Sequence, residues 1–265
     1  MLCEICEKKL VIFKSLKDFK LLKCKSCDHI VTDLTINKKY YKKTYSKKYI
    51  KEKHKNWMNN PNFLLFEKIS SFIENKKKGR ILDLGCGIGL FLNYLNKKNP
   101  KYDLTGVDII KQSKNKNKKI KFIQKEIFSY YPKKKFKFIV SIAVIEHVSK
   151  VNKFIEHLKK ISSKGSYCII LTLNTNSFLY KIANLLFYLN IKTPFLRLYD
   201  PHHLNHFSKK SFIKFFNING FDLVKNIKTP ISMKQVDYPY SNIFYKYLFY
   251  VGIKSIIILE KIFNM

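Results

Sequence analysis

The sequence predicts an α/β protein with a doubly wound, mostly parallel sheet, preceded by a small cysteine-rich unit. Three observations carry this prediction. Apolar strand-like and helix-like segments alternate through the middle of the chain, three closely spaced glycines follow the first of these strands, and two cysteine pairs stand near the amino terminus. Alternation of this kind is typical of parallel sheets, because each crossover between parallel strands needs a helix. At 265 residues with 46% hydrophobic residues, the chain can hold one such domain and a small appendage.

The elements are expected in a regular order. A helix with apolar residues at helical spacing covers 63–73, a last helix covers 211–219, and a polar linker at 38–61 precedes them. Between these helices we expect strands near 80–84, 103–107, 120–124, 136–142 and 166–172, with helices at about 89–98, 111–117 and 150–162. A doubly wound sheet binds its ligand at the carboxyl ends of the strands.

The segment RILDLGCGIGLF, residues 80–91, carries the strongest functional signal. An apolar strand runs into glycines at 85, 87 and 89, and an amphipathic helix then begins. A glycine-rich turn between a strand and a helix lets the backbone approach a nucleotide closely. Asp108 ends the next strand, about 20 residues further on, where a carboxylate can bind ribose hydroxyls. A lone Gly-x-Gly is more often an ordinary tight turn, but Asp83 and Asp108 in register favour a site for an adenosine-bearing ligand.

The amino-terminal cysteines have the spacing of a metal site. Cys3 and Cys6 form one C-x-x-C pair, Cys24 and Cys27 form the second, and 17 residues separate the pairs. Four thiolates in two tight pairs match tetrahedral Zn²⁺ and leave no open position, so the site is expected to be structural. Disulfides or incidental cysteines are the alternatives, and a reducing compartment disfavours disulfides. About 40 residues bury little core, so metal binding should supply folding free energy.

The charge balance is strongly basic. The chain has 52 Lys and Arg against 18 Asp and Glu, a formal net charge of +34. Arg80 and Arg197 are the only arginines, whereas proteins that read phosphates and bases favour the bidentate guanidinium. We therefore attribute the charge mainly to background composition, although it still favours anionic partners. No secretory signal and no long uncharged apolar run is evident, so we expect a cytoplasmic protein.

The glycine turn resembles motif I of the class I S-adenosylmethionine (SAM) methyltransferases. In that family Gly-x-Gly-x-Gly, preceded by Leu-Asp, packs against the methionine part of SAM. The resemblance covers about residues 62–228 and implies a seven-stranded Rossmann-like sheet. It also implies SAM as cofactor, with Asp83, Gly85, Cys86, Gly87, Gly89, Asp108 and Glu126 as the binding residues.

Two subgroups of this family are similar to particular segments. Small proteins that join a zinc ribbon to a methyltransferase, often encoded with cell-surface sugar or lipid genes, have a segment like His203-Leu-Asn-His-Phe-Ser208. Ubiquinone-pathway O-methyltransferases have Glu-x-x-Glu-His after the fourth strand, implicated there in divalent-metal binding. This chain keeps Glu146 and His147 but has Ala143 in place of the first Glu.

These observations predict methylation of an oxygen on a small-molecule, sugar or lipid-linked acceptor. His203 is the first candidate for the general base and His147 the second, because imidazole suits proton transfer near neutral pH. An RNA methyltransferase with a zinc-ribbon appendage and a non-catalytic SAM-binding module are the alternatives. The first lacks the Asn/Asp-Pro-Pro-aromatic stretch of base-amine methylation, since Ile145-Glu-His-Val148 stands there. The second would need a damaged SAM motif.

The domain organisation follows from these assignments. The prediction is a zinc ribbon at 1–37, a linker at 38–61, a methyltransferase domain at 62–228 with an acceptor lid at about 175–207, and an apolar, basic segment at 229–265. The lid has an apolar helical stripe from Phe178 to Leu189, which either packs on the core or forms a groove for a lipid or aromatic acceptor. Together with the tail at 243–263, it leaves open a peripheral contact with an anionic membrane.

Overall fold

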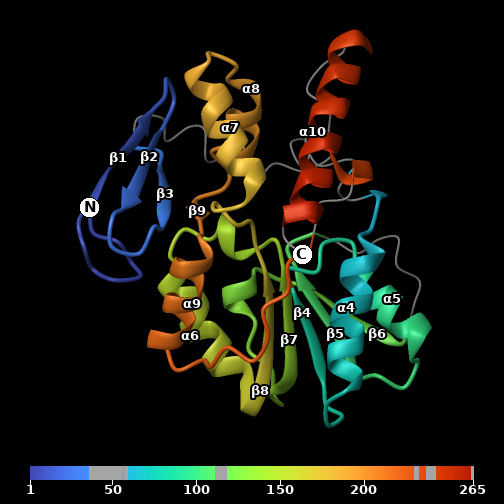
Figure 1. Cartoon of the computed structure of the whole chain (residues 1–265). Helices are drawn as coiled ribbons and strands as arrows, with labels where there is room; N and C mark the ends of the chain where they lie inside the picture. Colours follow the sequence, from blue (N-terminus) through green and yellow to red (C-terminus); the bar gives the residue numbers. More distant parts are fainter. Residues whose placement is uncertain (36–55, 57–58, 111–117, 230–232, 237–242, 264–265) are drawn as a thin grey trace. The chain divides into compact units, whose positions relative to one another are not determined.

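The computed structural model describes the chain except for residues 36–55, 57–58, 111–117, 230–232, 237–242 and 264–265 (Figure 1). The predicted helix at 111–117 and most of the predicted linker lie outside the described residues. The chain divides into two compact units. One unit combines Met1–Asn60 with Leu173–Met265, and the other is Pro61–Thr172. We call them the ribbon unit and the sheet unit.

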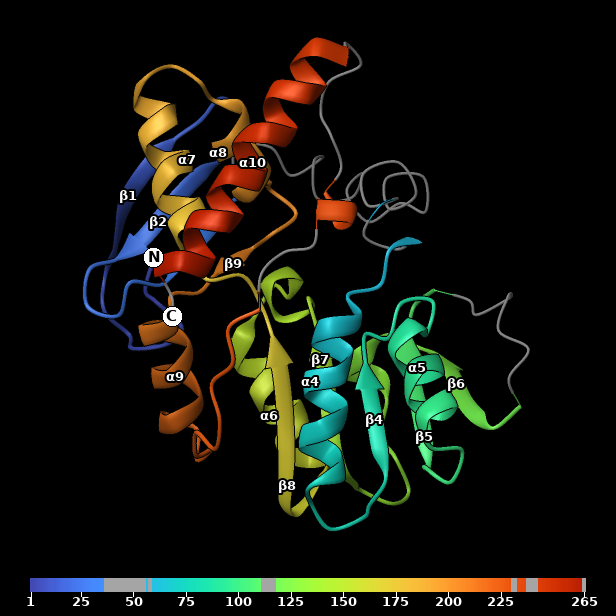
Figure 2. The same cartoon turned by 45° about the vertical axis from the view of Figure 1, so that its right-hand side comes forward.

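The sheet unit contains a parallel sheet of five strands in the order β6-β5-β4-β7-β8 (Figure 2). The strands are β4 (Ile81–Leu84), β5 (Leu104–Asp108), β6 (Ile120–Gln124), β7 (Phe136–Ile142) and β8 (Ser162–Leu171). The helices are α4 (Phe63–Glu74), α5 (Leu90–Lys98) and α6 (Val151–Ile161), with short 3-10 helices η1 (Ile127–Ser129) and η2 (Ile145–His147). The chain builds β5 and β6 on one side of β4 and then β7 and β8 on the other, so the predicted doubly wound α/β fold is confirmed.

Both faces of this sheet are covered. The side chains of α4 and α5 pack on one face, with the rings of Phe66 and Phe91 5.2 Å apart, and Ile81 and Phe138 belong to the same cluster. Strand residues whose side chains point to the other face, such as Leu82, are also buried. The helix α6 has its own set of buried apolar residues. Two covered faces explain why the central strands β4 and β7 are mostly apolar and almost entirely buried, rather than alternating between buried and exposed residues.

The predicted strand count was wrong. In the described part of the sheet unit, five strands form the sheet, not seven. After β8 the chain joins the ribbon unit, where β9 (Asn205–His206) pairs with a ribbon strand, and residues 221–229 have no strand assignment. α9 (Lys209–Ile218) lies within two residues of the predicted last helix. Gly220 has a positive φ of 80°, and the N–H of Phe221 bonds to the carbonyl of Phe216, which closes the helix as expected for a glycine C-cap.

The ribbon unit contains an antiparallel sheet in the order β1-β2-β3-β9 (Figure 1). Its first strands are β1 (Leu10–Ser15), β2 (Lys20–Cys24) and β3 (Ile30–Asp33), and its further helices are α7 (Phe178–Tyr188), α8 (Thr193–Leu198), η3 (Met233–Gln235) and α10 (Ile243–Phe263). None of the described helices is long and apolar enough to cross a bilayer.

The amino-terminal ribbon, which contains β1, β2 and β3, shares one largely aromatic core with the 175–207 segment. Phe19, Leu21 and Ile30 of the ribbon form a buried cluster with Tyr180 of α7 and with Phe195 and Tyr199 of α8. The rings of Phe195 and Tyr199 lie 4.5 Å apart, and those of Tyr180 and Tyr199 lie 5.1 Å apart. In α7 the buried residues are Tyr180 and Ala183, so this helix completes the core of a ribbon that is too small to build one alone. The predicted apolar stripe is not part of this core, and its residues Leu185 and Leu189 are exposed.

Candidate functional site

The glycine turn in the sheet unit follows β4 at the carboxyl edge of the sheet. Gly85 has φ 82°, and a Cβ at this position would lie 2.4 Å from the Cγ2 of Val144, so only glycine fits. Gly87 has φ 53°, and a Cβ there would meet no atom of the chain within 4 Å. The backbone at Gly87 therefore borders open space, as a cradle for a bound ligand requires. The third glycine, Gly89, is the N-cap of α5.

Asp108 joins the turn to the end of the neighbouring strand. Its Oδ2 accepts a hydrogen bond from the N–H of Gly87 at 2.7 Å, and its Oδ1 accepts one from the N–H of Ile110 at 2.8 Å. Each carboxylate oxygen has a second acceptor position, so the group can still take ribose hydroxyls. Burial raises the pKa of Asp108, although these backbone bonds favour its charged form. The predicted pairing of turn and carboxylate is thus present, with Asp108 also fixing the shape of the turn.

Asp83 is buried inside the carboxyl end of β4. Burial, and then the negative charge of Asp108, raise its pKa to about 8. A cation beside Asp83 would favour its charged form, and SAM carries positive charge on its sulfonium and amino groups. The residues around the turn therefore suit SAM, because they combine an open glycine backbone, a carboxylate for the ribose and a second carboxylate for a cationic group.

Two other predicted cofactor residues occupy different surroundings. The side chain of Cys86 is buried and its N–H bonds to the carbonyl of Val107, so this residue contributes packing and turn geometry. Glu126 is exposed just before η1, where its Oε2 accepts a hydrogen bond from the hydroxyl of Ser129 at 3.3 Å. Its contact with an adenine amine stays a prediction.

The end of β7 contains polar contacts that the sequence did not predict. The hydroxyl of Ser141 donates to the carbonyl of Leu84 at 3.0 Å, which ties β7 to the strand before the glycine turn. The Oε2 of Glu146 accepts from the hydroxyl of Thr172 at 3.0 Å, and burial raises the pKa of this carboxyl to about 7. Serine and threonine in strands give no signal in a single sequence, since their role depends on which strand lies opposite. His147 follows Glu146 and is half-buried.

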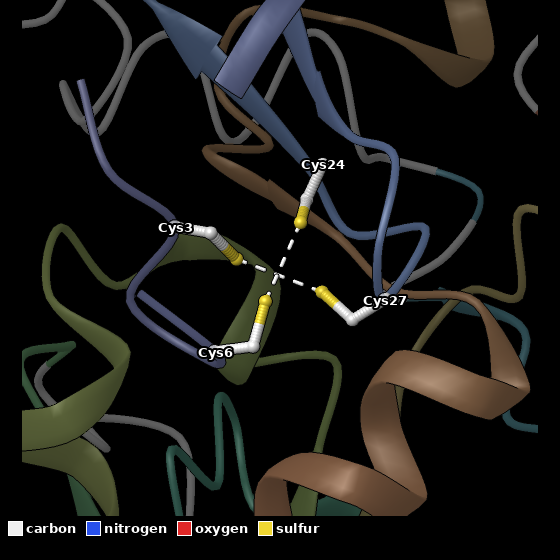
Figure 3. A group of neighbouring side chains, drawn as sticks. All are labelled: Cys3, Cys6, Cys24 and Cys27. Carbon is white, nitrogen blue, oxygen red and sulfur yellow. Dashed lines mark hydrogen bonds between the residues drawn. The ribbon is translucent and has the colours of Figure 1, made fainter. Parts of the chain in front are cut away.

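The four predicted zinc ligands converge in the ribbon unit (Figure 3). Their sulfur atoms all lie within 4.8 Å of one another, with 3.6 Å between Cys3 and Cys27 and 3.4 Å between Cys6 and Cys24. Sulfurs about 2.3 Å from a tetrahedral zinc ion are roughly 3.8 Å apart, so the four thiols fit zinc. All six cysteines of the chain are free thiols, which excludes the disulfide alternative in this structure.

The two cysteine pairs have the same local geometry. The residue after each pair, Glu7 or Asp28, has a positive φ near 60°, and its N–H bonds to the carbonyl of the first cysteine of that pair. Burial raises the pKa of Cys3 to about 11 and also raises the pKa of Cys27. Burial acts in the same direction on Cys6, but backbone and thiol hydrogen bonds outweigh it and lower the pKa to about 7. A bound cation would shift all four toward thiolate, so metal binding should release protons.

The histidine segment, which we define as residues 198–208 with His202, His203 and His206, lies in the ribbon unit. The Nδ1 of His203 lies 3.4 Å from the carbonyl of Leu198, and since a carbonyl only accepts, this nitrogen carries the proton in the neutral ring. The lone pair then sits on Nε2, as a general base needs. His202 has a carboxylate partner instead, with Nδ1 2.6 Å from the Oδ1 of Asp200. The Nε2 of His206 lies 2.9 Å from the hydroxyl of Thr32.

Comparison with known proteins places the chain in a protein family. Residues 53–226, more than half of the chain, match the model of the methyltransferase domain family. An uncharacterized protein of Methanocaldococcus jannaschii is 28% identical over 170 residues, covering 63% of this chain and 67% of that protein. A ubiquinone biosynthesis O-methyltransferase of Rickettsia canadensis is 30% identical over 118 residues, which cover 42% of this chain and 49% of that enzyme. The chain thus spans about half the length of this enzyme.

A solved structure has the same fold. The plantazolicin methyltransferase BpumL, crystallised with a triazolic desmethylPZN analog and SAH, aligns with a TM-score of 0.55 and 24% identity over 82% of this chain and 86% of that chain. The fold, the glycine turn and the family match together define a class I SAM-dependent methyltransferase, as the sequence predicted. The chain belongs to the methyltransferase domain family.

Substitution of Asp108 by asparagine tests the cofactor site. We expect SAM to bind more weakly by about 1.5–3 kcal/mol, the usual contribution of hydrogen bonds to a charged group. Asparagine is preferable to alanine, because it keeps an acceptor for one of the two backbone N–H groups. Calorimetry with SAM measures the effect. Asp103→Asn is the control, since Asp103 is an exposed carboxylate paired with Arg80 away from the turn. Equal SAM affinity in wild type and Asp108→Asn would contradict the assignment.

The buried carboxyls predict a pH dependence of stability. The pKa values of Asp83 and Glu146 are raised to about 8 and about 7, so the folded state retains protons that the unfolded chain loses near the ordinary carboxyl pKa. Their stabilisation is complete below that ordinary pKa and is lost as pH rises through 7 to 8. Thermal unfolding without SAM should therefore occur at lower temperature as pH rises from about 6 to about 9.

Asp83→Asn is expected to flatten this pH dependence, and Glu156→Gln, at an exposed position on α6, is the control. His157 contributes the opposite pH dependence. Burial lowers its pKa, so it destabilises the folded state only at acid pH, where the unfolded chain binds the proton more readily. An Asp83→Asn protein with the same pH slope as wild type would show that Asp83 is ionised throughout this range.

Proposed function

We propose that the chain transfers the methyl group of SAM to a hydroxyl oxygen of a small, sugar or lipid-linked acceptor. The observation that carries the proposal is the intact glycine turn with Asp108 in a member of the methyltransferase family. The similarity to ubiquinone biosynthesis O-methyltransferases supports oxygen as the methylated atom. SAM, when bound, supplies the electrophilic methyl group.

The reaction needs few protein groups. SAM held at the glycine turn, Asp83 and Asp108 would give its methyl group to the acceptor oxygen, with SAH as the other product. Positioning of the two reactants contributes on the order of 7–11 kcal/mol to such a reaction. A hydroxyl must also lose its proton as the new bond forms, and an imidazole is suited to accept it. We propose that the Nε2 of His203 takes this proton, because its Nδ1 faces a carbonyl and the side chain is half-buried rather than enclosed.

The neighbouring histidines are weaker candidates. His206 is buried and its Nε2 is engaged with Thr32. His202 is buried as well, but its bond to Asp200 is the kind of contact that orients a catalytic imidazole, so its variant belongs in the same experiment. His147, the second candidate, ends η2 after β7 and is half-buried.

The surroundings of Asp200 support a small polar acceptor group. A pocket of about 290 Å³ in the ribbon unit is lined by Asp18, Phe19, Thr193, Leu196, Arg197, Asp200 and Pro201. Carboxylates, a guanidinium and an aromatic ring in one small pocket offer hydrogen bonds and a flat apolar surface, which a sugar ring can use.

The helices of the ribbon unit support a lipid-linked acceptor. Apolar side chains of α7, α10 and the turn after α7 are exposed, namely Leu185, Tyr188, Leu189, Ile191, Ile243, Tyr247 and Val251. Lysines stand among them: the Nζ of Lys14 lies 3.8 Å from the centre of the Tyr188 ring, and Lys192 and Lys246 are exposed. Exposed apolar residues beside cations favour a peripheral contact with an anionic lipid surface.

The proposal is tested by following labelled methyl groups from SAM. Purified protein is incubated with an envelope extract or with total RNA, and label is expected in a lipid or sugar fraction of the extract. Asp108→Asn is the control for background transfer. Label in RNA would replace the proposal by the RNA methyltransferase alternative. Tight SAM binding without label in either substrate would support the non-catalytic alternative.

A further inference from the structure

We infer that the zinc ribbon holds the histidine segment in place, so that Thr32 is a positioning residue for His203 and metal binding is coupled to order in residues 198–208. The positioning role rests on the proposed function of His203. The coupling to the metal can be tested without any activity.

The strand that contains His206 depends on the ribbon for its pairing. β9 is only two residues long, and among the described strands its partner is β3, with Ile30 opposite His206 and Val31 opposite Asn205. β3 begins three residues after the zinc ligand Cys27. A two-residue strand has little stability of its own, so its position should follow that of β3.

Thr32 makes three contacts with this segment. Its backbone N–H donates to the carbonyl of Leu204 at 3.0 Å, its hydroxyl donates to the carbonyl of His203 at 2.7 Å, and the same hydroxyl lies 2.9 Å from the Nε2 of His206. A hydroxyl has one proton to donate. Since that proton goes to the His203 carbonyl, the hydroxyl must accept from His206, which fixes the proton of that imidazole on Nε2.

Further contacts join the ribbon to the histidine segment. The Nε2 of His29 lies 3.3 Å from the Oδ1 of Asn205, and the rings of His29 and Phe207 lie 4.7 Å apart. His29 is two residues after Cys27. The ring of Tyr199, in the core shared with the ribbon, lies 5.0 Å from that of His206. Residues 199–207 are therefore bound to the ribbon from both sides of His203.

The ribbon is too small to be stable without its metal. About 35 residues do not fold stably on their own core, and in small zinc units the metal supplies much of the folding free energy. Loss of zinc should therefore release β3, and with it the backbone at His203. A displacement of about 1 Å in a positioned group can cost on the order of 10²-fold in rate.

Hydrogen exchange of the full chain, with zinc bound and after chelation, tests the coupling. We expect faster exchange in the peptide covering 198–208 after zinc removal, with unchanged exchange in the peptide covering β4 and β5. Unchanged exchange in 198–208 would overturn the inference, whatever the methyl acceptor is.

Thr32→Val and Thr32→Ser test the hydroxyl. Valine has nearly the same shape without the hydroxyl, and serine keeps it. We expect Thr32→Val to retain zinc and SAM affinity, to increase exchange in 198–208, and to lower methyl transfer into the extract by roughly 10–100-fold. Thr32→Ser should restore both to near wild type. If Thr32→Val loses its zinc, the comparison of zinc-bound and zinc-free wild-type protein by hydrogen exchange still decides whether metal binding is coupled to order in 198–208. Wild-type exchange and rate in a zinc-loaded Thr32→Val protein would overturn the role of Thr32, while a failure of the proposed function would leave the exchange result intact.

Discussion

Replacement of His203 by alanine is expected to lower the rate of methyl transfer by roughly 10²–10⁴-fold, the usual contribution of a general base. SAM affinity should stay at the wild-type value, because the glycine turn and Asp108 lie in the other compact unit. The neutral imidazole is the active form, so the wild-type rate should rise with pH as histidine loses its proton, and this rise should disappear in the variant. Single-turnover transfer of label from SAM measures the rate.

His147→Ala and His202→Ala are the matched comparisons. A large loss in His147→Ala with a normal rate in His203→Ala would move the base to the end of β7. A large loss only in His202→Ala would assign the role to the His202–Asp200 pair. Normal rates in all three variants would mean that the acceptor needs no base, as for an oxygen that is already ionised.

Replacement of Cys24 by serine is expected to remove the metal and unfold the ribbon. Wild-type protein purified under reducing conditions should contain one zinc ion per chain, and the variant should contain none. Structural zinc contributes about 10–16 kcal/mol in small zinc units, so the β1–β3 sheet should lose its folded structure. Elemental analysis and hydrogen exchange of residues 1–35 give the result, and SAM affinity should change little.

Cys168→Ser is the control, because it makes the same chemical change at a thiol outside the cluster, in β8. Zinc-loaded Cys24→Ser protein with wild-type exchange in the ribbon would contradict the assignment of the four cysteines. Zinc-free wild-type protein with a fully protected ribbon would show that the shared aromatic core is sufficient by itself.

The sequence determined most of the sheet unit and which four cysteines come together. Strands β4 to β8 and helices α4 to α6 lie at or within a few residues of their predicted positions, because each is a strongly apolar or amphipathic segment between clear turns. The glycine turn, Asp108 and the four cysteines were found from spacing, since each depends on residue types at short distances along the chain. Such signals are local, and local signals survive in a single sequence.

Only the tertiary structure decided which distant segments meet. Residues 205–206, predicted as part of the acceptor lid, form the fourth strand of the ribbon sheet, and the main sheet has five strands instead of seven in the part of the chain described. The bonds of Asp108 to the Gly87 N–H, of Glu146 to Thr172 and of Thr32 to His203 and His206 join residues that are 21 to 174 positions apart. A two-residue strand or a single threonine hydroxyl carries no periodic pattern. Its partner is chosen by the packing of whole elements, and in the ribbon unit that choice is made by the shared core of Phe19, Leu21, Ile30, Tyr180, Phe195 and Tyr199.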